Sequence, residues 1–243
     1  MRQAAGAALD WFYPRHCYCC GAPLLEPGAH ILCPTCLGEL RDRRITGPVC
    51  TLCGHPLAGE RADRELCITC LSERRYFDRA RALFFYASPI KQVIISFKFH
   101  GNFFLGPRLL REALRRGWFP DGTNKPSAVV PIPLHPVRRR ERGYDQALLL
   151  GKVVAHHLGC DLWRRALRRI RYTSQQSLLP RHKRLDNVRG AFAVRDPALV
   201  EGRDILLVDD VFTSGATSIE CAKTLKKAGA GRVQALTLAR SAP

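Results

Sequence analysis

Short apolar runs alternate with longer amphipathic stretches over roughly the last two thirds of the chain. Four apolar runs have the length and composition of strands: 81–86, 128–133, 205–208 and 233–238. Helical periodicity predicts helices near 88–98, 103–117, 144–158 and 215–228. Such alternation is typical of an α/β domain with a mostly parallel, doubly wound sheet. A ligand is then expected beyond the carboxyl ends of the strands, where the junctions after Val130 and Val208 fall.

The amino-terminal part follows a different pattern, in which cysteine pairs replace apolar periodicity. Nine of the eleven cysteines lie between Cys17 and Cys70, and eight of them form four CxxC pairs: Cys17/Cys20, Cys33/Cys36, Cys50/Cys53 and Cys67/Cys70. CGAPL at 20–24 returns as CGHPL at 53–57, which indicates a duplicated four-cysteine unit. We therefore predict a cysteine-rich domain over 1–76 and an α/β domain over 77–243, joined by a charged hinge at 72–76.

The spacing of the cysteine pairs predicts metal binding. Twelve residues separate the two pairs of the first unit and thirteen separate those of the second. Each unit can therefore converge four thiolates on one Zn²⁺ about 2.3 Å away. Disulfides are the alternative, but a reducing cytosol and the strain of a CxxC bridge disfavour them. We expect two structural zinc ions, while the sequence leaves open which pairs share an ion. Cys160 and Cys221 are expected to be small core residues.

Positive charge is concentrated in one segment of the chain. The formal net charge is +18, and residues 134–190 contain 14 Lys and Arg against 4 Asp and Glu. This concentration indicates polyanionic partners, either a phosphorylated small molecule or nucleic acid, with a solvated basic face as the alternative. The amino terminus offers too short an apolar run for a secretory signal, and no run approaches the roughly 18 residues that span a bilayer. We expect a soluble cytoplasmic protein without membrane insertion.

The stretch ILLVDDVFTSGAT at 205–217 carries the candidate chemistry. Asp209 and Asp210 are expected at the carboxyl end of a strand, with residues 213–217 opening the next helix. Backbone N–H groups at a helix start, together with nearby hydroxyls, make a phosphate site. Two carboxylates beside it can accept hydrogen bonds from sugar hydroxyls or hold a divalent ion. A phosphate next to a vicinal diol predicts a ribose 5-phosphate.

Three other interpretations of this stretch compete with that prediction. A Walker A loop requires GxxxxGK[ST], which is absent. A phospho-accepting receiver domain pairs acids near a strand end but lacks the TSGAT cradle. A capped helix after an ordinary strand is the non-functional interpretation, since Asp and Thr are common helix caps.

The stretch DDVFTSGAT resembles the phosphoribosyl pyrophosphate (PRPP) motif of type I phosphoribosyltransferases. Further motifs resemble the ComF family of competence and DNA-utilisation proteins: FKFHG at 97–101, VVPIPLH at 129–135, RERGYDQA at 140–147, and RYTSQQSL through RLDNVRGAF over 171–192. The resemblance covers nearly the whole chain and implies a double zinc ribbon followed by a phosphoribosyltransferase-like domain. One residue departs from it, because the family usually has Asn where Asp145 stands.

The resemblance implies a role for each motif. Asp209 and Asp210 would hold the ribose hydroxyls of PRPP, and its 5-phosphate would lie on Thr213, Ser214, Gly215, Ala216 and Thr217. The pyrophosphate would face the turn Pro133, Leu134 and His135, with Mg²⁺ bridging it and the ribose. A long polar loop over 171–190 is expected to close over the site. Candidate basic and lid residues are Arg138, Arg142, Gln176 and Arg184.

The function implied by the resemblance is PRPP binding in the service of DNA uptake or utilisation, including the handling of internalised single-stranded DNA beside competence-machinery proteins. The chain would be a phosphoribosyltransferase with an unknown acceptor. One alternative is a nucleotide-salvage or purine phosphoribosyltransferase. Another is a non-catalytic scaffold that binds single-stranded DNA through the basic segment and aromatic side chains, among them Tyr144, Tyr172 and those of 97–104. Core packing is the competing interpretation of those phenylalanines.

Overall fold

A five-stranded parallel sheet forms the centre of the protein. The computed structural model describes residues 16–24, 31–57, 65–120, 125–174, 176 and 179–241. The strands stand in the order β1-β7-β6-β2-β3, and every neighbouring pair is parallel. Their bounds are β1 (Arg79–Phe85), β2 (Ala128–Pro131), β3 (Asp161–Leu162), β6 (Ile205–Phe212) and β7 (Val233–Arg240). The predicted α/β class with a parallel sheet is confirmed.

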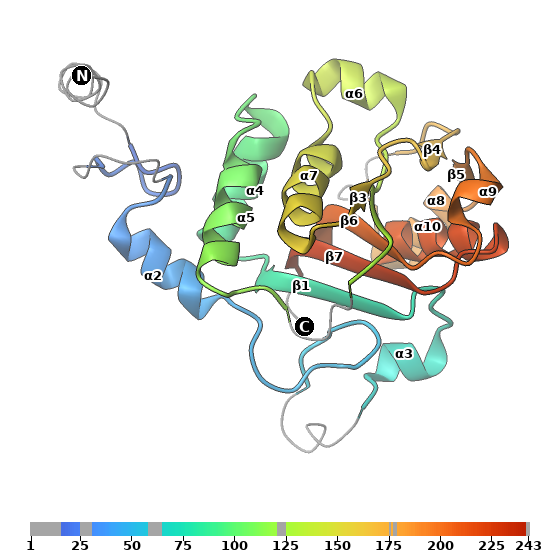
Figure 1. The fold of residues 1–243 in the computed structure, drawn as a ribbon. Helices are drawn as coiled ribbons and strands as arrows, with labels where there is room; N and C mark the ends of the chain where they lie inside the picture. Colours follow the sequence, from blue (N-terminus) through green and yellow to red (C-terminus); the bar gives the residue numbers. More distant parts are fainter. Residues whose placement is uncertain are drawn as a thin grey trace.

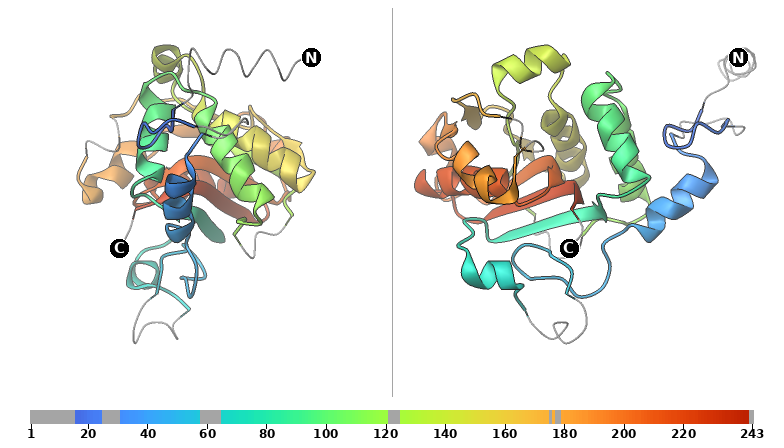
Figure 2. Two further views of the ribbon diagram at one scale, coloured as in Figure 1. Left: turned by 90° about the vertical axis from the view of Figure 1, so that its left-hand side faces the viewer. Right: turned by 180° about the vertical axis from the view of Figure 1, so that it is seen from behind.

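Helices cover both faces of this sheet (Figures 1 and 2). One hydrophobic core contains Leu206 and Val208 of β6 and receives α4 (Ile90–Phe99), α5 (Leu105–Arg115) and α7 (Gln146–Leu158). The other core contains Ile205 and Leu207 and receives α10 (Ala216–Lys227). Alternate residues of one strand therefore feed two cores, as a doubly wound sheet requires.

Local sequence explains where the best-formed helices begin and end. The Asp145 carboxylate accepts a hydrogen bond from Leu148 N at 3.0 Å and so caps the start of α7. The helix ends at Gly159, whose φ of 59° is the left-handed conformation that closes many helices. In α5 the buried residues include Leu105, Leu109 and Ala113, while arginines occupy the exposed face.

Several short elements were absent from the sequence prediction. They include α6 (Pro136–Arg142), the antiparallel hairpin β4 (Leu167–Arg169) and β5 (Phe192–Val194), η3 (Arg181–Lys183), α8 (Arg184–Val188) and α9 (Pro197–Val200). The predicted loop over 171–190 therefore contains η3 and α8 and is flanked by a hairpin. Side chains bonded to backbone groups order it: Arg184 Nε donates to Leu179 O at 2.9 Å and Asn187 Nδ2 to Ser174 O at 3.0 Å.

The two cysteine units contact the α/β domain at different places (Figure 1). The first unit, with α2 (Pro34–Asp42), shares its core with α4 and α5 through Cys17 and Leu40. The second unit, with α3 (Ile68–Ser72), lies against the outer edge of β1, where Ala80 N donates to Leu52 O at 2.7 Å. The chain between the units extends this contact, because Phe85 N donates to Arg43 O at 2.8 Å. The cysteine-rich part is thus attached along one side of the sheet.

No helix in the described part of the chain has both the length and the apolar character needed to cross a membrane.

Candidate functional site

The candidate site lies where β6 runs past its neighbour β2. Pairing with β2 reaches only Val208, whereas pairing with β7 continues until Phe212 stands opposite Arg240. The prediction that the strand ends at Val208 is wrong, because hydrogen bonding to β7 outweighs the low strand propensity of two aspartates. Asp209 and Asp210 consequently lie within β6, on the part of the strand that β2 does not cover.

The two carboxylates have different surroundings. Asp210 is buried and pairs with Lys98 of α4, at 2.6 Å from Oδ1 to Nζ. The Oδ1 of Asp209 accepts a hydrogen bond from Asp210 N at 2.8 Å. Burial and then the neighbouring Asp210 charge raise the pKa of Asp209 to about 7. Adjacent carboxylate oxygens in this setting can accept hydrogen bonds from a diol or coordinate a divalent cation.

Residues 213–217 comprise the tight turn after β6 and the first two residues of α10, and are here called the phosphate turn. Gly215 has a φ of +78°, and a Cβ at this position would lie 2.5 Å from the ring of Phe212. A larger residue would therefore strain the backbone and clash with that ring. Since α10 begins at Ala216, its first unpaired N–H groups lie at this turn. Asp209, the turn and Gln176 line one small hollow.

The predicted pyrophosphate turn follows β2 and leads into two capped helices. His135 caps α6, with its Nδ1 accepting a hydrogen bond from Val137 N at 3.4 Å. Pro133, Leu134 and Asp145 line the same cleft. Burial raises the pKa of Asp145, which also caps α7. The carboxylate at the position of the usual Asn thus serves as a helix cap, a role that either side chain can fill.

Arginines line most of this cleft, which has a volume of about 690 Å³. We call it the arginine cleft, and its arginines are Arg139, Arg140, Arg164, Arg165, Arg168, Arg169 and Arg195. Asp145 is the one carboxylate among its described lining residues. The cleft therefore combines the predicted pyrophosphate turn with a concentration of positive charge, which attracts polyanions.

The predicted basic and lid residues do not all reach the site. Arg138 pairs with Glu141 at 3.1 Å and lies over the Tyr172 ring, and Arg142 lies over Phe99. Gln176 adjoins the phosphate turn, with its Nε2 donating to Arg184 O at 3.2 Å. Gln176 is thus brought to the site, while Arg184 supports the loop that carries it. Two residues that contact the site were not predicted: Lys98, whose signal was the FKFHG motif, and Arg75, whose signal was only the charged hinge.

The paired cysteines gather into two clusters. The first is Cys17, Cys20, Cys33 and Cys36, and the second is Cys50, Cys53, Cys67 and Cys70, with ligand atoms within 4.8 Å of one another in each. The Sγ atoms of Cys20 and Cys33 lie 3.7 Å apart, and those of Cys53 and Cys67 lie 3.6 Å apart. A tetrahedral ion with bonds of about 2.3 Å requires sulfur–sulfur distances of about 3.8 Å. The two clusters therefore fit two structural zinc ions, and consecutive pairs share each site.

The isolated cysteines occupy different environments. Cys221 is fully buried in α10, as a core residue should be. Cys160 is partly exposed in the turn between α7 and β3, where it packs against the edge of the core. Neither belongs to a group of described residues that could hold a metal.

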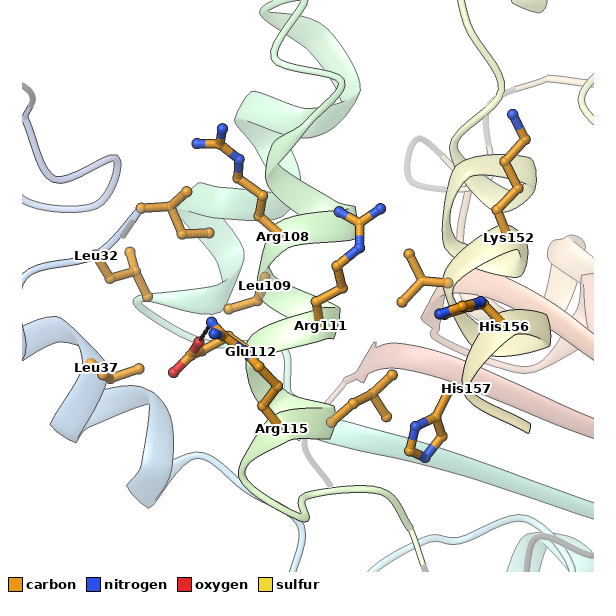
Figure 3. Close-up of a pocket in the computed structure, with 13 residues that line it drawn as sticks. Leu32, Leu37, Arg108, Leu109, Arg111, Glu112, Arg115, Lys152, His156 and His157 are labelled. Carbon is orange, nitrogen blue, oxygen red and sulfur yellow. Dashed lines mark hydrogen bonds and ion pairs between the residues drawn. The ribbon is translucent and has the colours of Figure 1, made fainter. Parts of the chain in front are cut away.

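A separate groove of about 760 Å³ lies around α5, α7 and the first cysteine unit (Figure 3). Leu32 and Leu37 lie on one side of α5, with Lys152 and His156 on the other. None of the predicted site residues is among those that line it. The groove is therefore distinct from the candidate site.

Comparison with known proteins identifies relatives over most of the chain. Residues 8–71 match the double zinc ribbon domain family. Competence protein F of Haemophilus influenzae is 30% identical over 214 residues, covering 86% of this chain and 90% of the relative. The DNA utilization protein YhgH of Salmonella typhi is 31% identical over 232 residues, covering 94% and 98%. The chain belongs to the ComF family.

A more distant relative extends the ComF assignment to another organism. Competence protein ComFC of Bacillus subtilis is 29% identical over 231 residues, covering 90% of this chain and 87% of the relative. Among solved structures, the glutamine PRPP amidotransferase of B. subtilis covers 54% of this chain and 25% of its own, at 21% identity and a TM-score of 0.36. That overlap is too small to carry an argument about the site. ComF membership supports a role in competence or DNA utilisation.

Proposed function

We propose that this ComF protein binds PRPP, or a related ribose 5-phosphate, as part of DNA uptake or utilisation in the cytoplasm. One observation carries the proposal: Asp209 and the phosphate turn line the same hollow at the end of β6, with Asp210 beside them. The hollow places acceptors for sugar hydroxyls next to donors for a phosphate. That combination matches the chemistry of a ribose 5-phosphate.

The surrounding residues supply what a pyrophosphate group would need. The turn from Pro133 to His135 borders the arginine cleft, and positive charge there favours a leaving pyrophosphate. The carboxylates of Asp209 and Asp210 would hold Mg²⁺. When bound, it would neutralise part of the charge that develops on the leaving group. Gln176 would cover the phosphate from the loop side.

Calorimetric titration with PRPP tests this proposal. We expect binding that requires Mg²⁺ and weakens at least about tenfold in Asp209→Asn and in Asp210→Asn, because each change replaces a carboxylate oxygen, which accepts, with an amide nitrogen, which donates. Asp196→Asn is the matched control, since Asp196 caps α9 outside the site. Equal affinity in the wild type and both site variants, or binding that is indifferent to Mg²⁺, would exclude the assigned site.

Single-stranded DNA is a second candidate ligand, and the arginine cleft is the observation that favours it. Exposed aromatic rings lie on adjoining elements: Tyr172 is 47%, Phe99 52% and Phe103 56% exposed. Stacking rings beside a basic cleft are typical of proteins that bind single strands. Core packing is confirmed for Phe97, which is fully buried, but not for Phe99 and Phe103.

Fluorescence anisotropy with a labelled oligo(dT) at several salt concentrations tests the second candidate. We expect log affinity to fall steeply with log salt, and Arg164→Ala with Arg165→Ala to reduce the slope by about 0.7 for each phosphate that the variant no longer binds. The control is Arg108→Ala with Arg111→Ala, which removes equal charge from the separate groove. Equal slopes for the two double variants would show that the arginine cleft has no special role.

A further inference from the structure

The second cysteine cluster shares its hydrophobic core with the phosphate turn. That core contains Cys50, Cys53 and Cys67 together with Phe212 and Ala216. The first cluster instead contributes to the core around α4, α5 and α7. Two clusters of the same composition therefore have different neighbours, and the second shares its core with Phe212 and Ala216 at the turn.

Arg240, at the end of β7, connects the second cluster to β6. Its Nη1 donates to Cys53 O at 2.8 Å, and its Nη2 lies 3.2 Å from His55 Nδ1. On the other side, its guanidinium lies 5.4 Å from the centre of the Phe212 ring. The same ring fills the space that a Cβ at Gly215 would need. A displacement of the Cys53 backbone would therefore reach the phosphate turn through Arg240 and Phe212.

Arg75 makes a second connection, from the hinge that follows α3. Its Nη1 donates to Ser214 O at 3.5 Å, and its Nη2 pairs with Glu73 at 3.0 Å. The side chain is only 4% exposed, although it comes from the cysteine-rich part of the chain. The helix α3 carries Cys70 and directly follows Cys67, so two cluster residues fix the segment from which Arg75 extends.

We propose that Arg240 and Arg75 are positioning residues through which the second cluster holds the phosphate turn in shape. Zinc in this cluster then sets how tightly the turn binds the phosphate of a ribose 5-phosphate. A cysteine unit of this size depends on its metal for its fold, so loss of the ion releases both contacts. The identity of the bound phosphate rests on the proposed PRPP function. The coupling between the cluster and the turn does not, because it exists in the ligand-free protein.

Hydrogen exchange of the amides of 213–217 tests the coupling without any ligand. In zinc-loaded, full-length protein, we expect Arg240→Met and Arg75→Met each to speed exchange by about tenfold, because the turn opens more often. Arg81→Met is the control for Arg240, since Arg81 also holds the second unit, donating to Cys50 O at 3.4 Å and to Thr51 O at 3.1 Å, whereas Arg240 is the residue that lies over the Phe212 ring of β6. Arg74→Ala is the control for Arg75, because Arg74 is exposed and lies over the Tyr76 ring. Both controls should exchange like the wild type.

A pair of ligand variants tests the role of the metal. Cys20→Ser and Cys70→Ser each remove one thiolate from the more accessible side of a cluster. We expect zinc content to fall in both variants. In Cys70→Ser, exchange of the turn should speed up, and affinity for ribose 5-phosphate should weaken, about tenfold more than in Cys20→Ser. Equal effects of the two variants, or wild-type exchange in Arg240→Met and Arg75→Met, would overturn the coupling. The two proposals can fail separately. If the arginine variants speed exchange of the turn but the wild type binds neither PRPP nor ribose 5-phosphate, the coupling is supported and the proposed function is refuted.

Discussion

At Asp209 the protein holds a carboxyl group where ionisation is unfavourable. Burial and the charge of Asp210 both oppose ionisation, while Lys98 favours it and is already paired with Asp210 at 2.6 Å. The folded chain therefore retains a proton at a pH where an exposed aspartate has lost it. A bound cation or a hydrogen-bonding diol would relieve this penalty, which is consistent with a site that is completed by its ligand.

This proton predicts a pH dependence of stability. The pKa of Asp209 rises from 3.8 to about 7, so its favourable contribution is complete below pH 3.8 and is lost as the pH rises towards 7. Asp209→Asn cannot ionise, so its unfolding free energy relative to the wild type should increase between pH 4 and 7 by on the order of 2–4 kcal/mol. Urea unfolding at pH 4.5 and pH 8 measures the change. A constant difference between the two proteins over this range would contradict the prediction, and Asp196→Asn serves as the control.

At the scale of elements, the sequence predicted those with strong periodicity. The strands β1, β2 and β7 and the helices α4, α5, α7 and α10 coincide with the predicted segments within a few residues, whereas β6 begins where predicted but continues to Phe212. The elements that it missed are short, such as β3 and α8. β3 is held by pairing two residues with β2, and the segment of α8 is ordered by side-chain hydrogen bonds such as that from Asn187 to Ser174 O. Periodicity carries no information about contacts of that kind.

The sequence was sufficient to predict the motif of the candidate site, but not the residues from elsewhere in the chain that contact it. Asp209, Asp210 and the phosphate turn are contiguous in sequence, so a local pattern could identify them. Lys98, Arg75 and Arg240 reach the same region from distant parts of the chain, and only the tertiary structure brings them there. The difference at Asp145 could likewise be interpreted only once its capping bond to Leu148 N was visible.

At the scale of the whole molecule, the cysteine-rich part covers one edge of the sheet. β1 is an outer strand, and on its free side Ala80 N donates to Leu52 O and Phe85 N donates to Arg43 O. Leu83 O also accepts from Ile45 N at 3.0 Å. The opposite outer strand, β3, has only two residues and offers few free backbone groups. One edge of the sheet is therefore covered by the cysteine-rich part, and the other is short.

Removal of zinc should uncover the long edge. After complete chelation, confirmed by metal analysis, we expect the protein to elute earlier from a sizing column and to scatter more light, because β1 can then pair with another chain. Restoring zinc before large particles form should reverse the change. An unchanged elution volume in metal-free protein would show that other contacts keep the edge covered.

The cover over β1 therefore gives the cysteines a second kind of importance. An unprotected strand of seven residues in a sheet is a template for aggregation, irrespective of any ligand that the protein binds. Zinc starvation would then remove this protein from solution as well as weaken its site. Zinc binding would thus keep the protein soluble, and the highest concentration at which the protein does not aggregate would depend on the supply of zinc.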